Sequence, residues 1–268
     1  MDEPYLRRWR PPHLPGVEVV SGRIPNYTRP QFTLSSSYTI KIRHGGTPPL
    51  VRYRGREQEA GAAGVVTVVE PDEVVQALGG NEARAEFDLL LVDAEVMPRG
   101  ASGLPRFRRL AYPDRGLFDG IAALHRGLAR DEDRLALQSV LTCLLDDLVT
   151  RHASAPGRAD PAIGPPALRR VREVLHDRLD ANVSLDELAA VAGCGKHHLL
   201  RSFRRAYGVP PHRYRTLLRL DRAMAMLVTG RSVAEVAATL GYCDQSQLNR
   251  HFRQALGMSA GAYAKTVR

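Results

Sequence analysis

Several polar side chains in the last third of the chain have the chemistry needed to read the edges of DNA bases. Arginine can bridge O6 and N7 of guanine, asparagine or glutamine can bridge N6 and N7 of adenine, and leucine can touch a thymine methyl group. The side chains predicted to contact bases are Lys196, His197, Leu200, Arg201, Gln245, Ser246, Asn249 and Arg250. Those predicted to bind phosphates, which position a protein without specifying sequence, are Arg204, Arg205 and Arg253. Any one of these arginines could instead be a solvated surface charge or form an internal ion pair.

These residues lie in a sequence unit that occurs twice. Residues 184–208 are matched by residues 232–257, at an offset of 48 that becomes 49 after one inserted residue near Cys243. The repeated positions include Leu199-x-Arg201-x-Phe203-Arg204 with Leu248-x-Arg250-x-Phe252-Arg253, and Tyr214 with Tyr263. Each unit is predicted to form a short helix, a glycine turn and a second helix. This is the pattern of a helix-turn-helix, which places its second helix in the major groove of DNA.

Local signals define the helices that must position these residues. Ser184 and Ser232 are predicted N-caps, each followed three residues later by the glutamate of a capping box. Glycines are predicted to end the helices, at Gly193, Gly208, Gly241 and Gly257. Apolar stripes spaced at i, i+4 and i+8 are predicted to face the core: Leu199, Phe203 and Tyr207, then Leu248, Phe252 and Leu256. A helix over 168–179 precedes the units and one over 214–228 joins them, so the two second helices should enter groove segments about 34 Å apart.

The net charge of the chain coincides with this repeat. Residues 1–166 hold 21 Lys and Arg against 21 Asp and Glu, whereas residues 167–268 hold 17 against 8, so the whole formal charge of +9 lies there. A basic domain joined to a neutral one is typical of DNA binding. A merely soluble basic surface is the alternative.

The region before the repeat changes from strands to helices. Apolar and β-branched runs bounded by turn residues predict strands at 17–20, 38–42, 64–69 and 87–93, within a β-rich segment that extends to about residue 112 and suggests a sandwich or barrel. Residues 116–152 then follow a helical period, with the acidic run 131–133 separating two helices. The second helix is apolar on more than one face, so we expect a homodimer through 116–152; packing of both faces within one chain is the alternative. The Pro- and Gly-rich stretch 153–166 is a predicted linker.

Composition excludes several other classes. The cysteines, Cys143, Cys194 and Cys243, are too scattered for a disulfide framework or a zinc site. Between residues 1 and 112 only His13 and His44 could supply imidazole ligands, so no metal and no cofactor is expected. There is no apolar run of membrane-spanning length, and the N-terminus does not resemble a signal peptide, so a cytoplasmic protein is expected.

The repeat resembles the AraC/XylS family of bacterial transcription regulators across about 168–263. The matching motifs are Leu188-Ala189, Leu199-x-Arg201-x-Phe203, Gly208-Val-Pro-Pro-x-x-Tyr214 and Val236-Ala237-x-x-x-Gly241-Tyr242-x-Asp244-Gln245-Ser246-x-Leu248-x-Arg250-x-Phe252. The chain departs from the family at Gly195, where a serine cap is common, and at Ala260, where proline is usual. The resemblance implies an α+β protein: a cupin-like β barrel with a helical dimerisation segment over 1–152, a linker over 153–166, and an all-α DNA-binding domain over 167–268 with two helix-turn-helix units.

The sequence therefore favours a sequence-specific DNA-binding regulator, not an enzyme, whose N-terminal domain binds a small-molecule effector. Double-stranded DNA is the expected partner, and RNA polymerase is a further candidate. A regulator controlled by a protein partner is the first alternative, and a cupin enzyme fused to a DNA-binding domain is the second. An enclosed apolar cavity would favour the small molecule, whereas an exposed apolar patch would favour the protein.

Overall fold

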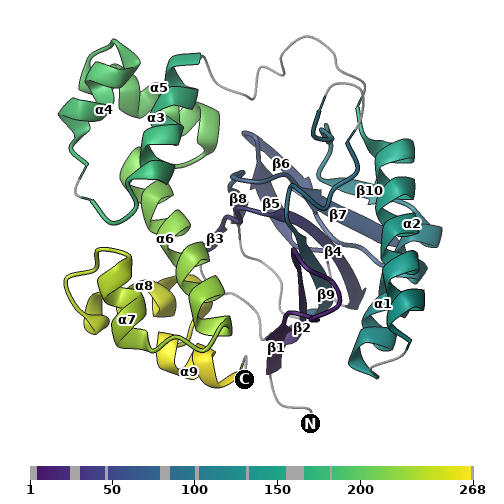
Figure 1. The fold of residues 1–268 in the computed structure, drawn as a ribbon. Coiled ribbons are helices and arrows are strands. Elements are labelled where there is room, and N and C mark those ends of the chain that lie inside the picture. The colour runs from purple at the N-terminus through teal and green to yellow at the C-terminus, as the bar shows by residue number, and fades with distance from the viewer. Residues whose placement is uncertain are drawn as a thin grey trace.

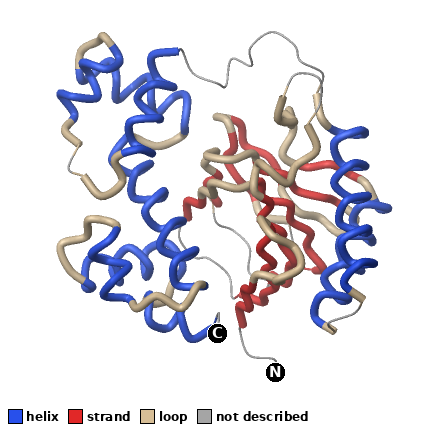
Figure 2. The backbone as a smooth tube through the Cα atoms, viewed as in Figure 1, coloured by secondary structure: helices blue, strands red, loops and turns tan. Residues whose placement is uncertain are grey.

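The protein consists of a β domain, a helical pair and an all-helical C-terminal domain, as a computed structural model shows (Figures 1 and 2). The structure describes residues 5–24, 31–45, 48–78, 85–99, 103–130, 133–154, 166–181 and 183–266. Most of the predicted linker lies outside these residues. No helix in the described part of the chain is long and apolar enough to cross a membrane.

The β domain contains two antiparallel sheets. The larger has the order β1 (Tyr5–Trp9), β2 (Val17–Ile24), β9 (Ala85–Val92), β4 (Tyr38–Gly45), β7 (Val65–Val69) and β10 (Ala111–Pro113). The smaller has the order β3 (Gln31–Thr33), β8 (Val75–Ala77), β5 (Leu50–Tyr53) and β6 (Arg56–Glu59). All four predicted strands are confirmed, as parts of β2, β4, β7 and β9. The described strands do not close into the barrel that the resemblance implied, because no strand of one sheet pairs with a strand of the other.

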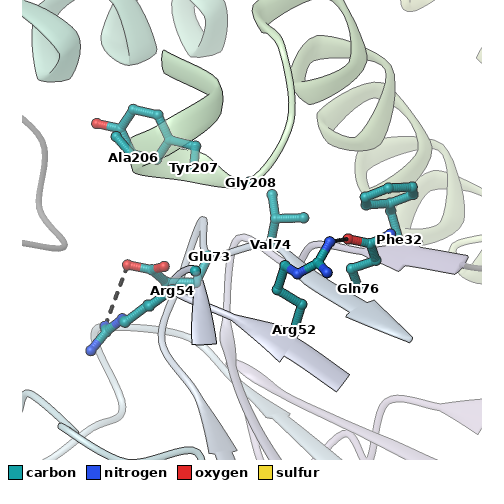
Figure 3. Close-up of a pocket in the computed structure, with 10 residues that line it drawn as sticks. Phe32, Arg52, Arg54, Glu73, Val74, Gln76, Ala206, Tyr207 and Gly208 are labelled. Atoms are coloured by element: carbon teal, nitrogen blue, oxygen red, sulfur yellow. Dashed lines mark hydrogen bonds and ion pairs between the residues drawn. The ribbon is translucent and has the colours of Figure 1, made fainter. Parts of the chain in front are cut away.

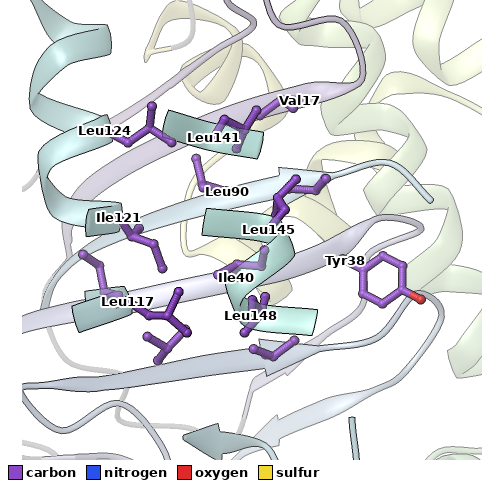
Figure 4. Close-up of a cluster of buried hydrophobic side chains, with 14 of the residues drawn as sticks. Val17, Tyr38, Ile40, Leu90, Leu117, Ile121, Leu124, Leu141, Leu145 and Leu148 are labelled. Atoms are coloured by element: carbon purple, nitrogen blue, oxygen red, sulfur yellow. The ribbon is translucent and has the colours of Figure 1, made fainter. Parts of the chain in front are cut away.

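Two antiparallel helices, α1 (Arg115–Ala129) and α2 (Arg134–His152), cover one face of the larger sheet (Figure 1). Asp114 and Asp133 cap them through their side chains, which explains why the predicted helical region divides near residue 131. The core between helices and sheet is mainly aliphatic, and its labelled members in Figure 4 are Val17, Tyr38, Ile40, Leu90, Leu117, Ile121, Leu124, Leu141, Leu145 and Leu148.

The two faces of the larger sheet differ because side chains alternate along each strand. In β4, Tyr38, Ile40 and Ile42 pack in the core beneath α1 and α2. Thr39, Lys41 and Arg43 point to the opposite face, where they line a cavity between the sheets. The strand pattern thus separates a dry packing face from a face with polar groups.

The C-terminal domain contains seven helices among the described residues: α3 (Pro166–Asp177), α4 (Leu185–Ala192), α5 (Lys196–Tyr207), α6 (Pro211–Val228), α7 (Val233–Thr239), α8 (Gln245–Leu256) and α9 (Ala260–Thr266). The long helix α6 joins the group α3–α5 to the group α7–α9 (Figure 1). Each group has its own apolar core, one around Leu199 and Phe203 and the other around Leu248 and Phe252. The predicted connecting helix and first helix are confirmed, each beginning two or three residues earlier than expected.

Candidate nucleic-acid interface

The first helix of each unit begins with the predicted capping box. In α4, the Ser184 hydroxyl accepts from the Glu187 amide at 3.2 Å, and the Glu187 carboxylate accepts from the Ser184 amide at 2.7 Å. Ser232 and Glu235 make the same pair of bonds in α7. These bonds lower the pKa of both glutamates. Both units therefore start from the same local geometry, as the repeat predicts.

The turns between the helices differ in length. Residues 193–195 separate α4 from α5, whereas residues 240–244 separate α7 from α8. Asp244 caps α8 by accepting from the Gln247 amide at 2.7 Å, whereas Gly195 gives α5 no side-chain cap. The longer second turn is the predicted consequence of the inserted residue, and it gives α8 the better fixed N-terminus.

The second helices, α5 and α8, separate core from surface along the predicted stripes. Leu199, Phe203, Leu248 and Phe252 are fully buried, and Tyr207 is nearly so. Leu256 is only partly buried, and it lines the cavity described below. Gly208 and Gly257 end the two helices in the left-handed conformation, with φ of 78° and 75°. Because the apolar stripe faces inward, the predicted DNA-contacting residues lie on the remaining surface.

Most of those residues are exposed. No ion pair within the described residues involves the five arginines, which are Arg201, Arg204, Arg205, Arg250 and Arg253. His197, Gln245 and Ser246 are also exposed, and Leu200 is half-buried. The Lys196 ammonium lies 2.6 Å from a carboxylate oxygen of Asp186, in a pair with both side chains open to solvent. A pair of that kind contributes little to stability, so a phosphate or a base can replace Asp186 at small cost.

Asn249 is the exception among the predicted readers. Its side-chain oxygen accepts from the Ala260 amide at 2.9 Å and so caps the N-terminus of α9. A bidentate contact with adenine needs both the oxygen and the amide group. In this arrangement one of the two lone pairs of the oxygen is used, so Asn249 links α8 to α9, and its contact with a base stays a prediction.

The sequence did not reveal how the helical units contact the β domain. The repeated tyrosine docks each unit: Tyr214 donates to the backbone oxygen of Asp72 at 2.9 Å, and Tyr263 accepts from Arg8 at 2.8 Å. Arg8 is itself held in a buried ion pair with Glu18. Both tyrosines are almost fully buried. Only the repetition of the tyrosine was visible beforehand, and its partners are remote in the chain.

Further contacts extend this interdomain interface. The Asp221 carboxylate on α6 accepts from the backbone amide and the hydroxyl of Ser36, at 3.1 and 2.8 Å. Burial raises the pKa of Asp221, and the bonds from Ser36 oppose that rise. Figure 3 shows the end of α5, at Tyr207 and Gly208, facing Glu73 and Val74 of the β domain. The β domain therefore contacts both units and the helix that joins them.

A cavity of about 330 Å³ lies between the two sheets and the C-terminal domain. Its wall is mainly apolar, and the C-terminal domain contributes Asp221, Met224, Leu256, Met258 and Tyr263 to it. Burial, and then the charge of Arg43, lower the pKa of Lys41 on its wall to about 8. The described residues contain no group of three or more His, Cys, Asp or Glu side chains placed to hold a metal ion.

Comparison with known proteins places the helical units in a family. Residues 188–266 match a family model described as a helix-turn-helix domain. This range contains most of α4, then α5 to α9, with both second helices and the linking α6. This is the region whose motifs resemble the AraC/XylS family.

The chain matches curated relatives that are named as regulators. It is 26% identical over 149 residues to an uncharacterised HTH-type transcriptional regulator, YbfI of Bacillus subtilis, covering 56% of this chain and 54% of the relative. It is 30% identical over 146 residues to the transcriptional activator NphR of a Rhodococcus species, covering 54% and 42%. The chain thus spans about half the length of the curated relatives that it matches.

The chain also shares its overall fold with solved structures of ToxT from Vibrio cholerae. The apo form of a ToxT variant has a TM-score of 0.63 at 10% identity, with 94% of this chain and 98% of that chain covered. A second ToxT structure, described as bound to an unsaturated fatty acid, has a TM-score of 0.57 at 10% identity, covering 94% and 95%. At this identity the likeness shows the fold and nothing finer.

Proposed function

We propose that the protein is a sequence-specific DNA-binding transcription regulator controlled by a small molecule bound in its N-terminal domain. The observation that carries the first part is the pair of exposed helices α5 and α8, which present Arg201 and Arg250 at equivalent positions without a carboxylate partner among the described residues. The whole net charge of the chain lies in the same domain. Such arginines lie on the second helices of helix-turn-helix units and are not engaged in ion pairs within the described residues. They are therefore available to bind base edges and phosphates.

The two units act as one rigid reader in this proposal. Arg219 on α6 donates to the backbone oxygen of Leu179, and its guanidinium stacks over the ring of Tyr242 in the second unit. Contacts on both sides of α6 fix the angle between α5 and α8. A single chain would then bind two short sequences about one helical turn apart, and the sequences would differ because the outward residues of α5 and α8 differ.

The cavity supports control by a small molecule rather than by a protein partner. It is largely apolar and bounded by both domains, as effector pockets commonly are. The ToxT structures of the same fold include one with a bound unsaturated fatty acid. The enzyme alternative is disfavoured, because the relatives that match are named as regulators.

A homodimer through α2 belongs to the same proposal. Leu135 is 71% exposed and Val140 is 40% exposed on this helix, although its opposite face is buried against the sheet. Pairing two copies across this stripe would remove the exposed leucine from water. RNA polymerase is the further partner expected if the regulator activates transcription.

The test is binding to DNA selected from random sequence by the full chain, followed by footprinting of the selected site. Arg250→Ala should weaken the selected site by about tenfold or more while changing the affinity for random DNA much less, because a lost base contact costs about 1–3 kcal/mol. Arg108→Ala removes the same charge from an exposed position of the N-terminal domain and serves as the control. Failure to select any preferred sequence would refute the proposed function.

A further inference from the structure

The wall of the cavity carries an unusual group of polar side chains on neighbouring strands. Lys41 on β4 lies directly opposite Thr67 on β7, and both point to the cavity, as does Arg43 two residues farther along β4. Thr67 and Arg43 are 6% and 5% exposed. Gly61 lies close to both of them: a Cβ added there would be 3.5 Å from the Cβ of Arg43 and 3.8 Å from the Thr67 hydroxyl. Two cations and a hydroxyl therefore converge on one region of an otherwise apolar surface.

Lys41 and Thr67 lack the partners that buried polar groups normally have. The Lys41 ammonium lies 4.3 Å from the ring centroid of Phe87, and no carboxylate among the described residues pairs with it. The Thr67 hydroxyl is buried and has no hydrogen-bond partner in the described part of the chain. Leaving a buried neutral group unsatisfied is unfavourable, and leaving a charge unsatisfied is more so.

Neither carboxylate of the same cavity pairs with Lys41 in the described structure, and each has another partner. Glu73 pairs with Arg54, and Asp221 accepts two bonds from Ser36. Arg8, a further charge of the wall, is held by Glu18. The Lys41 charge is thus not neutralised by any carboxylate that the structure describes, and the neighbouring Arg43 adds to the positive potential there.

We propose that Lys41 and Thr67, with Arg43 beside them, form the head-group site for an effector with one carboxylate on an apolar body. The carboxylate would pair with the Lys41 ammonium and accept a hydrogen bond from Thr67, and the apolar body would fill the cavity towards Met224 and Leu256. A neutral ligand would leave the ammonium without a counter-charge, and a cationic one would be repelled. This inference deepens the proposed control by a small molecule and rests on it.

The test uses ligands with one tail and three head groups: laurate, dodecanol and dodecylammonium. Titration calorimetry on the full chain should rank them in that order, with laurate at least tenfold tighter than dodecanol, since a charge-assisted pair in a shielded site is stronger than a neutral one. Lys41→Met should weaken laurate by about tenfold and leave dodecanol unchanged. Thr67→Val should lower the affinity for laurate by a smaller factor.

Lys265→Met is the matched control, because Lys265 is an exposed lysine of the same chain outside the cavity. Denaturant unfolding of each variant reports whether it is still folded. Equal affinity of the native protein for laurate and dodecanol would overturn the proposal, and so would a Lys41→Met variant that loses both ligands equally while it remains folded. DNA selection with the same preparations separates the two proposals. Specific DNA binding without a preference for the acid refutes only the head-group site, and acid binding without any DNA preference refutes only the regulator.

Discussion

The two turn glycines of the repeat allow a sharp test of how the units are held together. Gly193 and Gly241 occupy equivalent places and have φ of 64° and 66°, a conformation that alanine adopts at a cost of about 1–2 kcal/mol. A Cβ added at Gly193 would meet nothing within 4 Å. A Cβ added at Gly241 would lie 2.2 Å from the backbone oxygen of Asp180 and 3.0 Å from Arg219. The loop after α3 therefore packs directly against the turn of the second unit.

The expected costs follow from that difference. Gly193→Ala should destabilise its unit by about 1 kcal/mol, because the strain of the left-handed conformation is partly offset by the lower entropy of the unfolded chain. Gly241→Ala adds displacement of a packed backbone segment, which typically costs a further 1–3 kcal/mol, so a total of roughly 2–4 kcal/mol is expected.

Hydrogen exchange resolved by segment is the suitable assay, because Trp9 is the single tryptophan and reports on the other domain. Gly193→Ala should accelerate exchange chiefly in α4 and α5. Gly241→Ala should accelerate it in α7 and α8 and also at the end of α3, where the Arg219 bond to Leu179 would be disturbed. Equal effects of the two substitutions, or an effect of Gly241→Ala confined to its own unit, would refute the proposed packing between the units.

Three further predictions concern docking, pH and salt. Tyr263→Phe removes the hydrogen bond from Arg8, so it should destabilise the chain by about 1.5–3 kcal/mol in denaturant unfolding. The control is Tyr207→Phe, which should be nearly neutral because the buried Tyr207 hydroxyl has no partner in the described residues. Equal losses of stability in the two variants would contradict this. Burial raises the pKa of Asp72 to about 6, so folding stability should fall as pH rises from about 4 to 6. Asp72→Asn should abolish that fall and raise the free energy of unfolding at pH 7 by up to about 3 kcal/mol. A pH profile of stability that the substitution leaves unchanged would refute this. Arg253→Ala should reduce the slope of log affinity against log salt by about 0.9 on specific and random DNA alike, and an unchanged slope would exclude a phosphate contact.

The C-terminal domain was predictable because its signals are local. Capping boxes, helix-ending glycines and apolar stripes each act within one or two turns, and the structure confirms them at Ser184, Ser232, Gly208 and Gly257. The role of Asn249 was not predictable in this way. Its partner lies 11 residues later, in a helix that begins after a turn.

The β domain shows the opposite limit. The four predicted strands are apolar and central, whereas β3, β6 and β10 are short or charged and carry no alternating signal. In β4, the alternation of Thr39, Lys41 and Arg43 with apolar residues is typical of a sheet with one solvated face. The second sheet and the C-terminal domain cover that face, so the same pattern here indicates a polar cavity wall. Sequence periodicity distinguishes the two faces of a strand but does not reveal what covers each of them.

The repeated tyrosines connect the two functional halves of the molecule. Tyr263 lies on the cavity wall and bonds to Arg8, and its ring packs against Phe252 of α8. The Asn249 bond to Ala260 ties the same helix, α8, to the start of α9. A ligand that displaced Tyr263 would therefore act on the second recognition helix through two contacts. Tyr214 docks the first unit at Asp72, outside the set of cavity-lining residues, so occupancy of the cavity should act on the contact between the second unit and the β domain rather than on that of the first unit.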